Sequence, residues 1–475
     1  MWLPLFRKKR DAAGSGKSEK KGTLSIAEKS AWGLSGSSEN ILHNTTNIMA
    51  NPILNIGLGV SPVLVSMALA IPRIWDAFTD PLMGRISDNF KSRMGRRRPF
   101  VLFGGLLTGL AFAMIWMLPR GWSQMATFSL FLFYMLVFYT CFTVFVVPYL
   151  ALGFEMSPDY NERTVLMSYR SLFSLGGGII MQWIYWGCTR PCFDDTVQGM
   201  KVVGSVIGGF VILTSIVTAL FCKERAFHVT QKEPQKKISF YESVSVAWKV
   251  FPFVRVIGVC VLIIVGQMSI MGLGMYLNIY YVCKGSQEFA GRLQGVIGTG
   301  YMLSSLVIIP AVTWCSNRFG KKITLRGLML MGTAGSLLSW VCINPDYPYL
   351  QMVGLFLGGP AVTGLWIVAP SMIADVCDWD EWKNGLRREG AFGAAYGWFT
   401  KIGSTISLMV SGLVLTLTGF NADLGVDQSS GTILGMRVLV ALIPAATFIA
   451  AFFLLRRYDL SAELMQRIKE EKAEA

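Results

Sequence analysis

Two carboxylates, Asp76 and Asp80, lie four residues apart inside a long apolar stretch, residues 61–86. A spacing of four places both side chains on one face of a helix, about one turn apart. If this stretch crosses a membrane, a charge at its centre costs about 3 kcal/mol, so the pair predicts a site where a cation or a proton neutralises it. The alternative is structural: Asp80 ends the helix near a membrane edge while Asp76 pairs with Arg73.

Lys401 is a second charge in an apolar segment, near the middle of residues 390–418. A lysine at that depth needs an acidic partner, and Asp76 and Asp80 are the obvious candidates. A lysine that competes with a cation for these carboxylates would keep the empty site balanced in charge. Thr143 could add a hydroxyl ligand, because hard cations prefer oxygen. If sodium is the ion, we expect Asp76 and Asp80 to be its ligands.

Other polar side chains in the apolar segments are suited to an organic ligand. The planar guanidinium of Arg170 binds hydroxyl or carboxylate groups. Its alternative role is a structural ion pair with Glu155 or Glu162. Residues 27–56 are unusually polar and carry hydrogen-bonding groups suited to a polyol, namely Glu39, Asn40, Asn44 and Asn47. In the same stretch His43 is a candidate proton-titrating group, with packing as the alternative.

An acidic cluster ends another apolar segment, at Asp375, Asp378, Asp380 and Glu381. If it faces basic loops elsewhere in the chain, salt bridges could close the inner side of the protein. We therefore count Asp375, Asp378 and Glu381, together with Arg73, as candidate cytoplasmic gate residues; ordinary solvated charge is the alternative. The sequence has no nucleotide-binding glycine loop, nucleophile elbow or metal-ligand cluster, so it favours a protein that is not an enzyme.

The composition indicates which elements carry these side chains. Of 475 residues, 53% are hydrophobic and 15% charged, against about 25% charged in soluble domains. The mean hydropathy is +0.48. Segments of about 20 apolar residues cross a bilayer, and we predict an all-α membrane protein of twelve spans, the first lining a pathway: 27–56, 61–86, 99–118, 126–155, 163–187, 202–222, 253–282, 290–315, 322–343, 347–374, 390–418 and 432–455.

Basic residues alternate between the loops. Lysine and arginine gather after the second, sixth, eighth and last segments, and the loops after the third, fifth, seventh and ninth segments have few. Because basic loops stay cytoplasmic, both termini are predicted to be cytoplasmic. The excess of 43 Lys and Arg over 29 Asp and Glu is thereby explained without a nucleic-acid partner.

A weak internal repeat indicates two halves. Residues 87–98 follow the second segment, and the related residues 316–322 follow the eighth. Two six-helix halves with a midplane binding site between them are the plan of secondary transporters. The predicted divisions are a basic cytoplasmic tail (1–24), an N-terminal half (25–222), a central cytoplasmic loop (223–250), a C-terminal half (251–456) and a cytoplasmic tail (457–475). Cys188 and Cys192 share one loop and either form a disulfide or stay free.

Several segments together resemble one family. Residues 73–81, RIWDAFTDP, closely resemble the helix 2 signature of the glycoside–pentoside–hexuronide:cation symporters, the melibiose-permease branch of the major facilitator superfamily. The segments 95–99, 147–149 and 374–383 also match in order, and Lys401 within FTKIG fits the helix 11 lysine. The similarity spans about residues 25 to 465.

The resemblance implies the major facilitator fold and a cation site made by Asp76, Asp80, Thr143 and Lys401. It also implies that Arg170 is a sugar-site arginine.

Three departures fall on the sugar side of this pattern. The sequence has Glu39-Asn40 where the family's sugar transporters typically carry a Lys-Asp or similar acidic pair. Val146 replaces an acidic residue, and Leu150 stands where an aromatic stacks on the sugar. The cation machinery is thus similar to the family's, while the sugar site is remodelled.

We therefore expect a multi-pass protein of the plasma (inner) membrane, without a cofactor and functional as a monomer. It would be a secondary active transporter that moves a sugar or glycoside with Na⁺ or H⁺ by alternating access. The alternative substrate is a non-sugar amphiphile such as a lysophospholipid, which one branch of the family carries. A receptor that has lost transport is disfavoured, because it has no use for the buried charges Asp76, Asp80 and Lys401.

Overall fold

The computed structural model describes residues 24–157, 159–224, 248–385, 388–421, 424–460 and 462–474, and across these ranges the chain is helical without strands. The first bundle contains α1 (Ile26–Ala50), which continues as the π-helix η1 (Asn51–Gly57), then α2 (Pro62–Asn89), α3 (Arg98–Ile115), α4 (Gln124–Glu155), α5 (Tyr160–Gln182), α6 (Ile184–Cys188) and α7 (Thr196–Phe221). The second contains α9 (Phe251–Tyr276), continued by η2 (Leu277–Val282), α10 (Gln287–Phe319), α11 (Lys321–Cys342), η3 (Pro348–Leu350), α12 (Gln351–Asn384), α13 (Glu389–Leu417) and α14 (Ser430–Arg456), followed by α15 (Ala462–Glu474).

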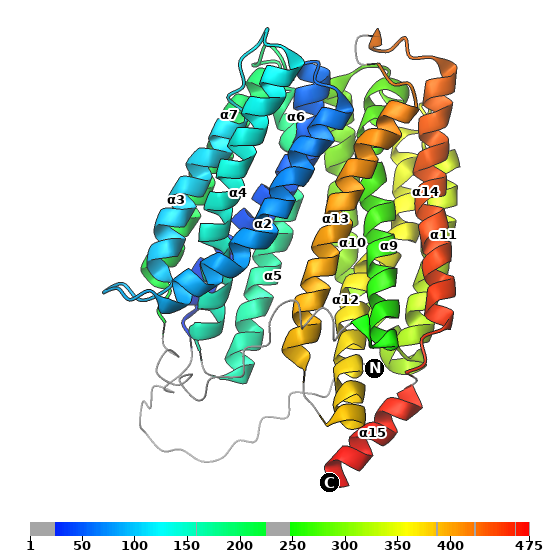
Figure 1. Ribbon diagram of the computed structural model, residues 1–475. Helices are drawn as coiled ribbons and strands as arrows, with labels where there is room; N and C mark the ends of the chain where they lie inside the picture. Colours follow the sequence, from blue (N-terminus) through cyan, green and yellow to red (C-terminus); the bar gives the residue numbers. More distant parts are fainter. Residues whose placement is uncertain are drawn as a thin grey trace, which may run out of the picture.

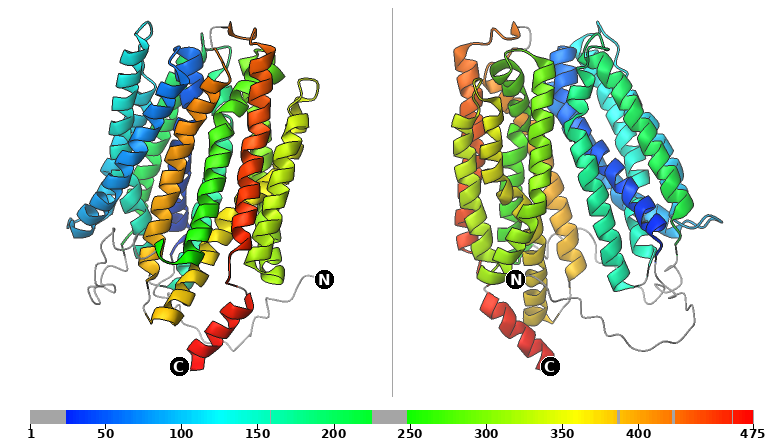
Figure 2. Two further views of the ribbon diagram at one scale, coloured as in Figure 1. Left: turned by 45° about the vertical axis from the view of Figure 1, so that its right-hand side comes forward. Right: turned by 180° about the vertical axis from the view of Figure 1, so that it is seen from behind.

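The helices form two bundles that lie side by side (Figure 1). In the first, α1 packs on α5, and α3 packs on α4 and α7; in the second, α9 packs on α13, and α11 packs on α12 and α14. The bundles meet through α2 against α13 and through α10 against α5 and α6. Figure 2 shows them together at one end and apart at the other, where α15 and the C-terminus lie.

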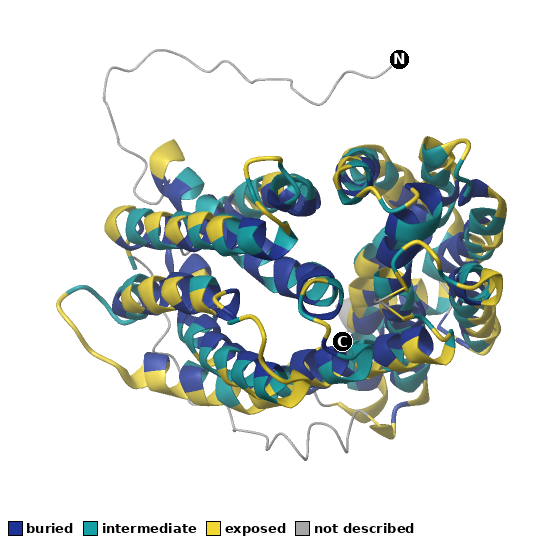
Figure 3. Ribbon diagram, turned by 90° about the horizontal axis from the view of Figure 1, so that it is seen from above, coloured by how far each residue is buried: buried dark blue, intermediate teal, exposed yellow. Residues whose placement is uncertain are grey.

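Nine of the helical stretches in the described ranges are long and apolar enough to cross a membrane. The predicted spans that do not meet this test are those of α1, α2 and α5, which carry most of the polar residues singled out above. The outer faces of the helices expose apolar side chains, while buried residues face the bundle interiors (Figure 3). This is the pattern expected of a multi-pass membrane protein, with polar spans held among apolar ones.

Short polar residues begin many of the helices. Ser25, Ser61, Ser123, Ser286 and Ser429 each accept a hydrogen bond from a backbone N–H in the first turn of the helix that follows. At α1, Ser25 and Glu28 form a complete capping box. These caps satisfy N–H groups that a helix leaves unpaired at its start, so they fix where the spans begin.

The bundles are joined at one end by small residues of α10 that lie against bulky residues of α5 and α6. We call this contact the outer seam; it consists of Gly291, Gly295 and Gly298 on α10 facing Trp186, Trp183 and Gln182 of the first bundle. A Cβ atom added to Gly291 would lie 2.8 Å from the Cα of Trp186, and one on Gly295 would lie 2.7 Å from the Trp183 ring. Only glycine permits this approach.

Neutral hydrogen bonds reinforce the outer seam. Trp183 Nε1 donates to Thr299 Oγ1 at 2.9 Å, and Gln294 Nε2 donates to Gln182 Oε1 at 3.3 Å. Nearby, Tyr276 Oη donates to Asn55 Oδ1 at 2.7 Å. Among the described residues, the recorded ion pair that joins the two bundles at this end is Arg190 with Glu288 at 3.0 Å, so the closed seam depends mainly on packing and dipoles.

At the opposite end, Glu224 ties the start of the central loop to α3. Its carboxylate accepts the backbone N–H groups of Arg96 at 2.8 Å, Arg97 at 2.7 Å and Arg98 at 3.2 Å. The side chain of Arg97 is buried and pairs with Glu155 of α4 at 3.2 Å. The predicted tail 1–24, apart from Leu24, and most of the predicted central loop lie outside the described residues, and the cytoplasmic placement of the termini stays a prediction.

Candidate functional site

The four residues expected to form a cation site come together between the bundles. Lys401 of α13 reaches α2, where its Nζ lies 3.0 Å from Asp76 Oδ2 and 2.5 Å from Asp80 Oδ2. From α4, Thr143 Oγ1 lies 2.9 Å from Asp76 Oδ1 and 3.0 Å from Asp80 Oδ1. The i, i+4 spacing on α2 therefore aligns two carboxylates toward one lysine and one hydroxyl. Thr79, which the sequence analysis missed, adds a hydroxyl 3.3 Å from that of Thr143.

The charges of this cluster are incompletely balanced. Two carboxylates share one ammonium, so with all three ionised the cluster carries one net negative charge. Asp76 is nearly enclosed, with 10% of its side chain exposed, whereas Asp80 and Lys401 are 32% and 39% exposed. A small cation can therefore approach from the side of Asp80 and take carboxylate and hydroxyl oxygens as ligands while Lys401 withdraws.

Glu39 and Arg170, two of the predicted substrate-binding residues, bind each other. Arg170 Nη2 of α5 lies 2.5 Å from Glu39 Oε2 of α1. The alternative partners weighed for Arg170 are engaged elsewhere: Glu155 pairs with Arg97, and Glu162 pairs with Lys29 at 3.0 Å. The pair joins α1 to α5 within the first bundle.

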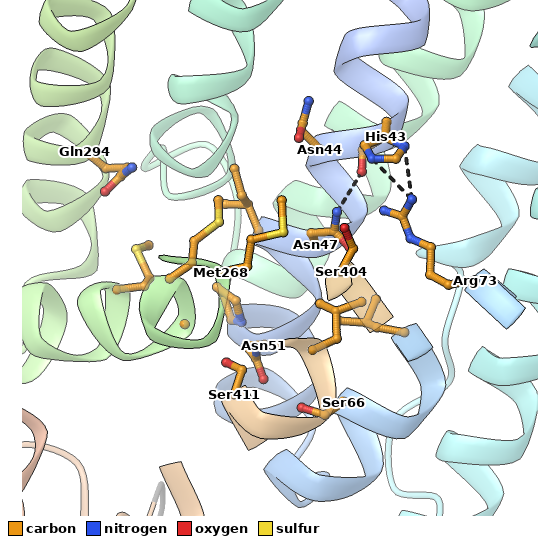
Figure 4. Close-up of a pocket in the computed structure, with 17 residues that line it drawn as sticks. His43, Asn44, Asn47, Asn51, Ser66, Arg73, Met268, Gln294, Ser404 and Ser411 are labelled. Atoms are coloured by element: carbon orange, nitrogen blue, oxygen red, sulfur yellow. Dashed lines mark hydrogen bonds between the residues drawn. The ribbon is translucent and has the colours of Figure 1, made fainter. Parts of the chain in front are cut away.

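A pocket of about 910 Å³, counting its open part, lies between the bundles (Figure 4). We call it the central pocket; its lining comprises His43, Asn44, Asn47, Ile48, Asn51, Pro52, Ser66, Leu69, Arg73, Met268, Met271, Gly272, Met275, Gln294, Ser404, Leu408 and Ser411. Arg73 lies one turn from Asp76 along α2, and Ser404 one turn from Lys401 along α13, so the pocket adjoins the cation cluster.

The central pocket has two chemically different walls. Asn44, Asn47 and Asn51 follow one another on α1 and η1 at intervals of three and four residues. On α9, Met268, Met271 and Met275 have the same spacing, which places them on one face as well. The first bundle thus supplies a row of amide groups beside the apolar Ile48, Pro52 and Leu69. The second supplies a row of thioethers, which adapt to irregular shapes, beside the polar Gln294, Ser404 and Ser411.

Of the polar residues predicted to bind substrate, Asn44 and Asn47 line the central pocket in the part of the chain that the structure describes, and so does His43. Asn40 is one turn away and accepts a hydrogen bond from Asn44 at 3.0 Å through its backbone carbonyl. Val146 is buried, and Leu150 packs against the apolar core. The sequence analysis missed the methionine face, although its i, i+3, i+7 spacing opposite a polar first span was a readable signal.

Arg73, expected at a cytoplasmic gate, lies instead on the wall of the central pocket. Its Nη1 is 3.2 Å from each ring nitrogen of His43, and its guanidinium lies 5.2 Å from the centre of the Tyr139 ring. No carboxylate among the described residues pairs with it, and its Nε has no hydrogen-bond partner there. The alternative pairing of Asp76 with Arg73 is thus wrong, because Asp76 binds Lys401.

The acidic cluster of α12 makes its recorded ion pairs within its own bundle. Asp375 pairs with Lys321 at 2.6 Å, and Asp380 pairs with Arg388 at 2.5 Å. α12 continues as a helix to Asn384 rather than ending near residue 374, so Asp378 and Glu381 lie on its last turns. For Asp375, the expected bridge to the other half is replaced by a bridge to the start of α11. Cys188 and Cys192 are both free, the first buried and the second exposed.

Two helical bundles that meet around a polar pocket, with buried charges shared between them, define a secondary membrane transporter rather than an enzyme. The chain matches the MFS/sugar transport protein family over residues 32–462 and belongs to that family. The family assignment and the all-α membrane fold expected from the sequence are confirmed.

Several proteins are similar to this chain over nearly its whole length. The chain is 25% identical to the mouse sodium-dependent lysophosphatidylcholine symporter 1, over 95% of this chain and 89% of that protein. It is 26% identical to the uncharacterized symporter YnaJ of Bacillus subtilis, over 94% and 95% of the two chains. The structure of a bacterial homologue of the human lysosomal transporter Spinster, inward-facing and unoccupied, superposes with a TM-score of 0.66 at 12% identity and covers 92% of this chain and 98% of that chain, which shows the fold alone.

Proposed function

We propose that the protein couples Na⁺ entry to the uptake of an organic substrate, with Asp76, Asp80 and Thr143 as sodium ligands and Lys401 as their competitor. The observation that carries this proposal is that Lys401 of the second bundle is shared by two aspartates of the first. A sodium ion that takes these oxygens must displace the ammonium, and with it an ionic link between α2 and α13. Ion binding is thereby tied to the relative position of the bundles.

Through this link, the sodium gradient alone can drive substrate uptake, because sodium binding and substrate binding are coupled. If sodium stabilises the arrangement in which the central pocket binds substrate, substrate must strengthen sodium binding by the same factor. The membrane potential adds about 2.3 kcal/mol per charge per 100 mV. The names of the sodium-dependent relatives support Na⁺ over H⁺ as the coupling ion.

For the substrate, we propose an amphiphile with a polar head, of the lysophospholipid kind. The central pocket supports this choice, because its lining combines a row of asparagines from the first bundle with a row of methionines from the second. The second candidate is a sugar or glycoside, favoured by the amide and hydroxyl groups of Asn44, Asn47 and Ser404. The separation of Val146 and Leu150 from the pocket removes these residues from either proposal.

The test is uptake into proteoliposomes that contain the purified protein. Labelled lysophosphatidylcholine and a panel of labelled glycosides are offered under an imposed Na⁺ gradient and, separately, under an imposed pH gradient. We expect accumulation with Na⁺, and its loss in Asp76→Asn. Asp346→Asn, the same chemical change in the loop before η3, is the control and should accumulate normally. Uphill uptake by Asp76→Asn would refute the sodium site, and accumulation driven by pH alone would replace Na⁺ with H⁺.

A further inference from the structure

Arg73 is a buried-pocket cation whose recorded partners carry no negative charge. It contacts the His43 ring and the face of Tyr139, and its Nε is without a hydrogen bond within the described ranges. By contrast, Arg170 has Glu39 as partner, and Lys401 has two aspartates. A guanidinium withdrawn from water is stabilised by an oxyanion, which it binds through two parallel N–H groups.

The formal charges of the side chains around the central pocket indicate a role for Arg73. Glu39 and Arg170 cancel each other. Asp76 and Asp80 are matched by Lys401 together with Arg73, so the ionised centre is neutral before any ligand enters. When a sodium ion binds, one positive charge is in excess, and the group nearest to the central pocket that carries such a charge is Arg73.

We propose that the transported substrate carries a carboxylate or phosphate group that Arg73 binds in the central pocket. This inference rests on the proposed sodium-coupled symport and specifies its substrate class. The anion restores the balance that the sodium ion upsets, so each ligand favours the other electrostatically although they bind different residues. Asn44 and Asn47 line the same pocket, and each donates one amide hydrogen to a backbone carbonyl of α1, which leaves a second for the substrate; Met268 and Met271 cover the apolar remainder.

The experiment compares molecules that differ only in the anionic group. One pair is p-nitrophenyl glucuronide and p-nitrophenyl glucoside; the other is lysophosphatidic acid, whose phosphate is its only charged group, and the monoacylglycerol with the same acyl chain. Binding is followed by the thermal stability of the purified protein in NaCl, and transport by Na⁺-driven uptake into proteoliposomes. We expect the anionic member of at least one pair to bind about 10- to 100-fold more tightly than its neutral counterpart, since a charged hydrogen bond contributes about that factor. The pair that responds identifies the source of the anion.

Arg73→Gln should remove this preference, and Arg73→Lys should keep part of it. Arg437→Gln is the matched control, because Arg437 is also an intramembrane arginine over aromatic rings but does not line the central pocket. Stabilisation of Arg73→Gln by Na⁺ alone should remain, which separates this proposal from the sodium site. The proposal is overturned if neither anion binds better than its neutral partner, or if Arg73→Gln retains the preference. If Na⁺ does not raise the thermal stability of the wild-type protein, the proposed function itself is overturned.

Discussion

The glycines of the outer seam allow a test of how the two bundles exchange conformations. In Gly291→Ala, the new Cβ would lie 2.8 Å from the Cα and 2.9 Å from the backbone nitrogen of Trp186. Carbon atoms in contact lie about 3.5–4.0 Å apart, so α10 and α6 must separate by roughly 1 Å. The clash is with backbone and cannot be relieved by turning a side chain.

The expected magnitude follows from the cost of overpacking, about 1–3 kcal/mol. The penalty falls on the conformation in which the outer seam is closed. The higher helix propensity of alanine acts on α10 in both conformations and cancels between them. The ratio of closed to open forms should therefore fall by about 5- to 150-fold.

Spin labels at exposed positions can report this change. Trp122→Cys and Tyr347→Cys place labels on loops of different bundles at the seam end, in a Cys192→Ser background that removes the exposed native thiol. Pulsed electron resonance should show longer distances in Gly291→Ala than in the parent.

Gly209→Ala is the control, because a Cβ at Gly209 meets no atom within 4 Å. Gly295→Ala, whose Cβ would meet the Trp183 ring, provides a second variant if Gly291→Ala does not fold. Unchanged distances in a folded variant would refute the argument that the glycines hold the seam closed.

Four further predictions concern other parts of the protein. Lys401→Met should abolish Na⁺-driven accumulation in proteoliposomes while Na⁺ still stabilises the protein, because the competitor is lost and the ligands remain; loss of the Na⁺ response would assign Lys401 a direct role in binding. Thr143→Val should weaken that Na⁺ stabilisation about tenfold, the value of one lost polar ligand, with Thr143→Ser as the variant that keeps it; equal responses would exclude the hydroxyl. Glu224→Gln should lower the free energy of unfolding by about 1 kcal/mol through a weaker cap on α3, measured in detergent, and an unchanged unfolding transition would contradict this. Maleimide should label the exposed Cys192 and leave the buried Cys188 unmodified, and a disulfide found by mass spectrometry would contradict the recorded free thiols.

The cation cluster was predictable from the sequence because each of its charges lies in an otherwise apolar span. Charged residues in such spans are paired inside the protein. The i, i+4 spacing of Asp76 and Asp80 places both carboxylates on the same face of α2, so one partner can bind both. The pairing of Glu39 with Arg170 was not predictable, because it depends on the rotation of α1 against α5. The sequence likewise does not show how α4 is rotated, which leaves Val146 buried and outside the lining of the central pocket.

The partner of Arg73 was harder still to predict from the spacing of residues within one segment. It lies in the same signature as Asp76, three residues earlier, and that spacing made an ion pair between them a reasonable alternative. The second bundle settles the matter, since Lys401 approaches from α13 and occupies both aspartates. At α12 the error had a different origin: the polar residues after 374 were read as the end of a span, whereas the helix continues to Asn384. Asp375 and Asp380 form ion pairs along this continuation, and Asp380 is fully buried.

The link between Lys401 and Asp76 also bears on how the protein is made. The two residues are 325 positions apart, so at about 5–20 residues per second the ribosome needs roughly 15 to 65 s to produce the lysine after the aspartate. Throughout that interval α2, already too polar to count as an apolar span, must reside near the membrane without its ionic partner. The neighbouring apolar helices α3 and α4 are available much earlier, and Thr143 of α4 supplies the first polar contact for both carboxylates. Until the second bundle exists, the first bundle can offer these carboxylates the Thr143 hydroxyl but not the ammonium of Lys401.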